Sequence, residues 1–116
     1  MNTQEMNTQD RKAAISAYKK RERAIGIYEL RCAAADAVWV GQTTNLDAIW
    51  NRMRFTLEHG SHPSRSLQAA WNAHGERAIA LSVLERIEDE ESSYILNGLL
   101  KERCAAWRTR LGAQAI

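Results

Sequence analysis

Apolar residues recur at regular intervals along most of the chain and predict a series of short helices and strands. The clearest stripe follows Asn45 and has the spacing of one face of an α-helix: Leu46, Ile49, Trp50, Met53 and Leu57. Asn45 is a suitable N-cap and Gly60 a suitable end for this helix. Similar spacing predicts a helix at residues 10–22, and a short helix that begins at Ser64 or Ser66 and ends at Gly75. A last helix carries apolar residues from Ile95 to Leu111 and ends at Gly112.

Alternating or continuous apolar runs predict strands at residues 24–31, 38–42 and 78–87, with a hairpin connection at residues 33–36. The resulting order, α-β-β-α-α-β-α, predicts an α+β fold with a small three-stranded antiparallel sheet flanked by helices. Residues 1–9 repeat Met-Asn-Thr-Gln and contain little to bury, so they are expected to form a flexible tail. Residues 10–116 are expected to form a single domain.

Composition places the chain among ordinary globular proteins. It has 116 residues, 45% hydrophobic and 26% charged, which suffices for one core. The apolar runs are too short for a membrane span, and the N-terminus lacks the pattern of a secretion signal, so a cytoplasmic location is expected. Cys32 and Cys104 are distant in sequence and lack the spacing of a metal site, which favours reduced thiols.

Charge is unevenly distributed although the net charge is only +2. Basic residues, including Lys19 and Lys20, dominate residues 11–31, whereas residues 85–91 are mainly acidic. A basic segment of this kind could meet nucleic-acid phosphates, and the alternative is an ordinary solvated helix surface. Charge alone leaves both interpretations open.

Two short motifs suggest a family. Gly26-Ile27-Tyr28 lies in the first predicted strand and Trp39-Val40-Gly41 in the second, followed by Gln42-Thr43 and the helix cap. This arrangement resembles the GIY-YIG nuclease superfamily, with Trp39 in place of the second tyrosine. The resemblance covers roughly residues 24–111 and implies metal-dependent hydrolysis of DNA phosphodiester bonds with Mg²⁺ or Mn²⁺.

The resemblance also implies roles for individual residues. Tyr28 would lie at the reacting phosphate with support from Trp39, and Glu85 at the end of the third strand would bind the metal. Asn97 matches an asparagine of repair-type members, and Gly26 and Gly41 are the motif glycines.

The phosphate-binding arginine of the family corresponds to Ile49 here, and a histidine that often follows it corresponds to Met53. Both lie on the apolar stripe. Arg52 is about 60° around the helix from Ile49 and is the candidate substitute.

Further cations are candidates for nucleic-acid binding: Arg54, Arg65, Lys19 and Lys20. His59 and His62 invite a metal interpretation, but no third ligand with suitable spacing accompanies them, which favours a solvated loop.

Three hypotheses follow. The first is a metal-dependent endonuclease that uses Tyr28, Arg52 and Glu85. The second is a degenerate member that binds nucleic acid without cutting it, and the third is a protein-interaction module. Because no separate targeting domain is evident, a nuclease of this size would be weakly specific or directed by a protein partner. Oligomeric state is not encoded in these patterns.

Overall fold

The computed structural model describes residues 23–116, which form a mixed sheet between two layers of helices. The sheet has four strands in the order β3-β1-β2-β4. Strand β1 (Gly26–Cys32) pairs antiparallel with β2 (Ala37–Thr43) and with β3 (Ile79–Arg86). The short β4 (Gln114–Ala115) pairs with β2 in the parallel direction.

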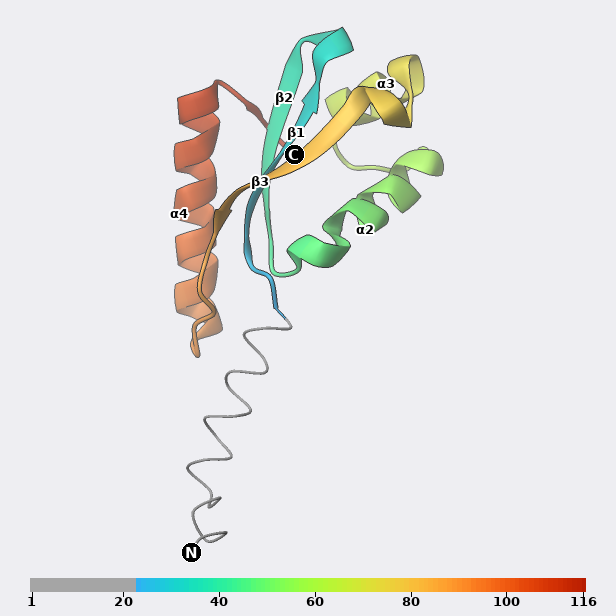
Figure 1. Ribbon diagram of the computed structural model, residues 1–116. Helices are drawn as coiled ribbons and strands as arrows, with labels where there is room; N and C mark the ends of the chain where they lie inside the picture. The colour runs from blue at the N-terminus through green and yellow to red at the C-terminus, as the bar shows by residue number, and fades with distance from the viewer. Residues whose placement is uncertain (1–22) are drawn as a thin grey trace, which may run out of the picture.

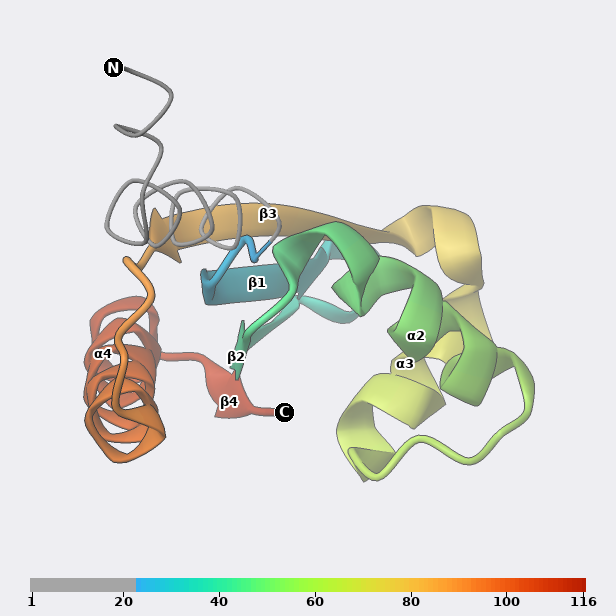
Figure 2. The ribbon, with the colours of Figure 1, turned by 90° about the horizontal axis from the view of Figure 1, so that it is seen from below.

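Helices cover both faces of the sheet, as Figures 1 and 2 show from two directions. Helix α4 (Ser93–Leu111) lies on one face, and α2 (Leu46–Glu58) and α3 (Arg65–His74) lie on the other. Two 3₁₀ turns, η2 (Ala33–Ala35) and η3 (Glu76–Ala78), complete the connections. Each face has its own apolar core, so side chains on alternate strand positions enter different cores.

The alternation along β1 decides which core receives each residue. Tyr28, Leu30 and Cys32 enter the core under α2 and α3, whereas Ile27 enters the core under α4. Tyr28 pairs with Gly41 on β2 and with Val83 on β3. These pairings fix the surroundings of the first motif.

The helix boundaries follow the capping residues that the sequence indicates. The Asn45 side chain accepts a hydrogen bond from the Ala48 amide at the start of α2. Ser64, rather than Ser66, caps α3, and Gly112 ends α4 with a φ of 61°. Side-chain acceptors satisfy amides that would otherwise lack partners in the first helical turn.

The predicted α+β class is confirmed, and the number of strands needs correction. The sequence predicted three antiparallel strands, whereas β4 adds a fourth in parallel orientation. A two-residue strand is too short to produce a recognisable alternation. The predicted tail at 1–9 and helix at 10–22 lie outside the described residues. No helix between residues 23 and 116 has the length and apolar character needed to cross a membrane.

Candidate functional site

Tyr28 lies with its ring against Gly41 of the neighbouring strand. A Cβ atom built on Gly41 would fall 2.5 Å from the Tyr28 hydroxyl and 2.7 Å from Cγ2 of Ile116. Such distances are well below van der Waals contact, so the absence of a side chain at Gly41 provides the space for the ring. The Tyr28 residue is 2% exposed, and Ile116 covers the same spot from the end of β4.

The environment of Tyr28 opposes ionisation of its hydroxyl. Burial raises the Tyr28 pKa to about 12, and the nearby Cys104 thiol acts in the same direction. The positive charge of Arg52 partly offsets this rise, which means that the Arg52 guanidinium lies close enough to Tyr28 to influence its pKa. At neutral pH Tyr28 is therefore a phenol that can donate a hydrogen bond.

Trp39 belongs to the core under α2 and α3 and is only 1% exposed. Its indole Nε1 donates a hydrogen bond to Oγ of Ser66 on α3 at 2.8 Å. This bond satisfies the one polar group of a buried indole and joins β2 to α3. Trp39 is thus held by a helix of the core, and its proposed supporting role beside Tyr28 stays a prediction.

Helix α2 presents apolar side chains where the family would place charged ones. Met53 is buried, and Ile49 packs against the same core as Tyr28. Arg52 lies on this helix with its side chain exposed, yet its charge reaches Tyr28. The fold therefore places Gly41 against the Tyr28 ring and Trp39 in the same core, and Arg52 is the candidate cation whose charge acts on Tyr28.

Glu85 lies on the opposite face of the sheet from Tyr28. Its Oε1 accepts hydrogen bonds from Arg103 Nε and Trp107 Nε1 of α4, each at 2.9 Å. The hydrogen bond from Trp107 is the main cause of a lowered Glu85 pKa, and Arg103 adds to it against the effect of burial. These contacts hold the carboxylate ionised and directed at α4.

A register shift in β3 explains this position. Ile27 pairs with Glu85 and Tyr28 with Val83, so Leu84 is the extra residue of a β-bulge. In a regular ladder Leu84 would pair with Ile27, and Glu85 would project from the same face as Tyr28. The extra residue moves Glu85 to the other face.

The side chains around Tyr28 include few that could bind a divalent cation. Among the described residues, no group of three His, Cys, Asp or Glu side chains is arranged to hold a metal ion. Glu85, the predicted ligand, already accepts two hydrogen bonds on the far face. Glu85 therefore does not supply a carboxylate ligand for Mg²⁺ or Mn²⁺ beside Tyr28.

The remaining candidates lie in different places. Arg54 is within 3.8 Å of Glu58 and 3.5 Å of Glu76, so its charge is partly compensated. Arg65 is exposed at the start of α3, and Asn97 is exposed on α4. A Cβ on Gly26 would collide with the backbone carbonyl oxygen of Glu85, which explains glycine there. Lys19 and Lys20 lie outside the described residues.

Two solved structures of the catalytic domain of the homing endonuclease I-TevI resemble this chain in fold and sequence. One has a TM-score of 0.67 at 30% identity, and the match covers 79% of this chain and 97% of that domain. The other, in which one glutamate is replaced by alanine, has a TM-score of 0.66 at 31% identity, with coverages of 77% and 84%. The chain belongs to the GIY-YIG nuclease superfamily.

A phage protein gives a consistent but shorter match to this GIY-YIG chain. Intron-associated endonuclease 1 of Enterobacteria phage T4 is 34% identical over 70 residues. The match covers 60% of this chain and 28% of the phage protein, so the chain spans little more than a quarter of that relative. No protein-family model matches the chain.

The GIY-YIG fold brings residues to Tyr28 that the sequence did not single out. Cys104 of α4 acts on the Tyr28 pKa, and Ile116 meets the ring at Gly41. Neither residue has a sequence signal for this position, because both contacts join segments distant in the chain. Arg103 and Trp107 are four residues apart on a predicted helix, and that spacing was a usable signal for a shared partner.

Proposed function

We propose that this GIY-YIG domain binds DNA and that Tyr28 and Arg52 together hold a backbone phosphate. The observation that carries the proposal is the position of Arg52, which is exposed on α2, the helix that covers the Tyr28 face of the sheet, and whose positive charge acts on the Tyr28 hydroxyl. A protonated phenol donates one hydrogen bond, and a guanidinium supplies several together with a positive charge. A phosphate accepts both, because its oxygens are anionic acceptors.

Other cations on α2, α3 and the following turn support this choice. Arg52, Arg65 and Arg77 are exposed and form no ion pair with the residues described. Tyr28 belongs to the core under α2 and α3, and Figure 1 shows both helices on one face of the sheet. Uncompensated arginines on this side would attract the DNA backbone by charge.

Metal-dependent hydrolysis of DNA is the second candidate. It is favoured by the similarity to the I-TevI catalytic domain and by the Tyr28–Arg52 pair. Hydrolysis of this type would need Mg²⁺ or Mn²⁺ to stabilise charge on the phosphate. The predicted metal ligand Glu85 is directed at α4 on the other face of the sheet, so we rank binding before hydrolysis.

A salt titration tests the binding proposal. Fluorescence anisotropy of a labelled DNA duplex would give the affinity of the full chain at several salt concentrations. We expect Arg52→Ala to reduce the slope of log K against log salt by about 0.9, the value for one lost phosphate contact. Tyr28→Phe should weaken binding and leave the slope unchanged, because no charge is removed.

Lys101→Gln is the matched control, because Lys101 is an exposed cation on α4, across the sheet from Tyr28. An equal change in slope for Lys101→Gln and Arg52→Ala would contradict a specific role for Arg52. An absence of DNA binding by the wild type would overturn the proposal and favour a protein-interaction module.

Nicking of supercoiled plasmid with Mg²⁺ or Mn²⁺ tests the second candidate. We expect no nicking above background from the wild type. Nicking that is lost in both Tyr28→Phe and Glu85→Ala would instead establish hydrolysis and a metal role for Glu85. Nicking unaffected by both substitutions would indicate a contaminating nuclease.

A further inference from the structure

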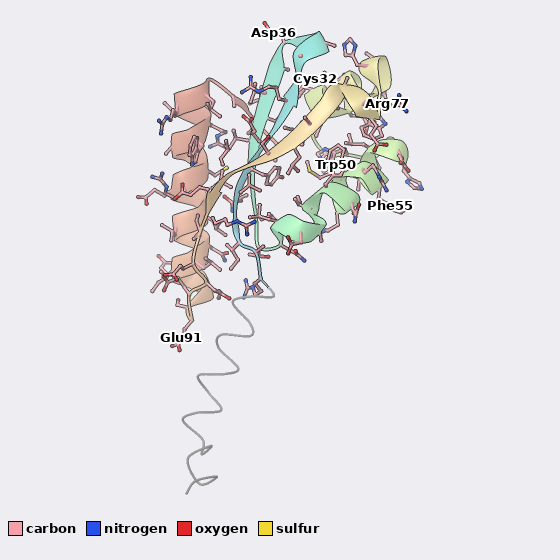
Figure 3. All side chains as sticks on the ribbon, viewed as in Figure 1. Cys32, Asp36, Trp50, Phe55, Arg77 and Glu91 are labelled. Carbon is pink, nitrogen blue, oxygen red and sulfur yellow. The ribbon has the colours of Figure 1, made fainter. Side chains whose placement is uncertain are left out.

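A hollow of about 410 Å³ lies between α2 and the beginning of β3. Its lining combines aromatic, aliphatic and charged side chains: Trp50, Glu76, Arg77, Ile79 and Leu81. Figure 3 shows that Trp50 projects from α2 towards the sheet and that Arg77 lies near the turn before β3. Helix α2 and the continuous stretch from η3 into β3 therefore build this hollow.

Trp50 gives the hollow a flat aromatic wall. The indole is partly exposed, and Trp71 of α3 supports it at a centroid distance of 6.4 Å and an interplanar angle of 57°. Its Nε1 donates no hydrogen bond to the residues described, unlike the indole nitrogens of Trp39 and Trp107. The ring thus keeps both an accessible apolar surface and an unused donor.

Arg77 gives the rim of the hollow a positive charge. It forms no ion pair with any residue from 23 to 116. The other charged lining residue, Glu76, is compensated by Arg54 at 3.5 Å. An occupant of the hollow would therefore meet an aromatic plane beside a free guanidinium, the two groups on which nucleobases stack.

The hollow is next to Tyr28 along the same face of the sheet. Leu81 in its lining pairs with Leu30, and Val83, two residues further on, pairs with Tyr28. Two residues along a strand correspond to about 7 Å, roughly one nucleotide step in an extended strand. Val83, the neighbour of Tyr28 on β3, is 42% exposed, so an apolar side chain is open to solvent at the Tyr28 end of this path.

We propose that this hollow holds an unpaired nucleobase, stacked on Trp50 and contacted by Arg77, next to the phosphate at Tyr28 and Arg52. The inference rests on the proposed function and adds a substrate class to it. A base inside a regular duplex cannot reach the indole plane, so the ligand is single-stranded or locally unpaired DNA. Stacking on an aromatic ring tolerates any base. The site is therefore expected to distinguish unpaired from paired DNA and not one base sequence from another.

Anisotropy with two labelled single-stranded oligonucleotides tests this assignment. One oligonucleotide carries all its bases, and the other has the same backbone with abasic sites at its centre. We expect the wild type to bind the intact oligonucleotide about tenfold more tightly than the abasic one. Trp50→Leu should bind both with the lower affinity, because the stacking plane is gone while an apolar side chain still fills the space.

Phe55→Ala is the control, because Phe55 is a 62% exposed aromatic on the same helix that does not line the hollow. It should behave like the wild type. Arg77→Gln changes an exposed residue outside both cores, so it serves as a second test variant if Trp50→Leu unfolds. Arg77→Gln should reduce the preference for the intact oligonucleotide.

The outcomes separate this inference from the function on which it rests. Equal binding of intact and abasic oligonucleotides by the wild type would overturn the base site and leave phosphate binding at Tyr28 and Arg52 intact. Equal losses for Phe55→Ala and Trp50→Leu would also overturn it. If neither oligonucleotide nor duplex binds, the proposed function itself has failed.

Discussion

At the scale of single residues, the chemistry of Tyr28 depends on burial and on one nearby charge. The ring is held against Gly41, and the Arg52 charge and the Cys104 thiol both act on the pKa of its hydroxyl. Burial favours the neutral phenol, and the Arg52 charge only partly opposes it. Tyr28 is therefore suited to donate a hydrogen bond to a phosphate, and poorly suited to accept a proton as a tyrosinate at neutral pH.

The raised pKa of Tyr28 predicts a loss of stability at alkaline pH. Above the ordinary value of 10.0, the unfolded chain releases this proton, whereas the folded chain retains it up to about pH 12. The contribution of Tyr28 to stability is thus complete below pH 10 and decreases as the pH rises towards 12, by about 2–3 kcal/mol in total.

Urea unfolding of the wild type and Tyr28→Phe at pH values from about 9 to about 11 measures this effect. The free energy of unfolding of the wild type, relative to that of Tyr28→Phe, should fall with increasing pH. The paired comparison matters because burial also raises the pKa of Cys104, which acts in the same direction in both proteins. A constant difference across the pH range would refute the buried-phenol interpretation.

At the scale of elements, two polar contacts join strands to helices across the two cores. The Trp39–Ser66 hydrogen bond joins β2 to α3, and the Glu85 carboxylate joins β3 to two residues of α4. Both contacts involve residues to which the family resemblance gave a functional role, Trp39 as a catalytic residue and Glu85 as a metal ligand. In this chain the Trp39 and Glu85 side chains join strands to helices, which supports a contribution of both residues to the stability of the fold.

Glu85→Ala is therefore expected to lower stability. Removing the carboxylate leaves the Arg103 guanidinium and the Trp107 N–H without their acceptor, at a cost of about 1–2 kcal/mol for this partly exposed contact. The lowered pKa of Glu85 means that its contribution is present above the ordinary value of 4.5 and is lost as the pH falls below it.

Thermal and urea unfolding at neutral pH and at about pH 3 check this prediction. Glu102→Gln is the control, because Glu102 is an exposed carboxylate on α4 with no ion pair among the described residues. The difference between the wild type and Glu85→Ala should shrink at acid pH. An unchanged stability of Glu85→Ala would mean that the contacts with α4 contribute little.

At the scale of the whole molecule, the two faces of the sheet separate groups that metal-dependent cleavage would need together. Tyr28 and Arg52 belong to the α2 side, and Glu85 belongs to the α4 side. Ile49, Met53 and Trp39 contribute to the core under α2 and α3. This arrangement retains the fold of the I-TevI catalytic domain and keeps Tyr28 and Arg52, the proposed phosphate-binding pair, apart from Glu85.

Restoring the missing family residues tests this view of the molecule. The double substitution Ile49→Arg and Trp39→Tyr supplies the arginine and the second tyrosine. We expect a less stable protein, because Trp39 is almost completely buried and the Trp→Tyr change leaves space in a packed core. We also expect no plasmid nicking, because the substitutions do not return Glu85 to the Tyr28 face.

Circular dichroism must first establish that the double variant is folded. Nicking by the folded variant that disappears on further substitution of Tyr28→Phe would contradict the expectation and would favour a decayed nuclease centre. The single variant Ile49→Arg leaves the buried Trp39 in place. It therefore controls for destabilisation of the core by the Trp39→Tyr substitution.

The sequence by itself determined the order and type of the main elements between residues 23 and 116. Hydrophobic periodicity located the helices and strands, and Asn45, Gly75 and Gly112 marked helix boundaries. The two motifs identified the superfamily, and the stripe on α2 correctly indicated that Ile49 and Met53 contact the core. These features are encoded over a few consecutive residues, so a linear pattern is sufficient to reveal them.

Only the tertiary structure decided which side chains meet. An extra residue at Leu84 transferred Glu85 to the α4 face, and a two-residue β4 brought Ile116 to Gly41. The hydrogen bond of Trp39 to Ser66 and the effect of Arg52 on Tyr28 likewise join distant segments. Such contacts depend on strand register and on the packing of helices over each sheet face, which hydrophobic periodicity within one segment does not specify.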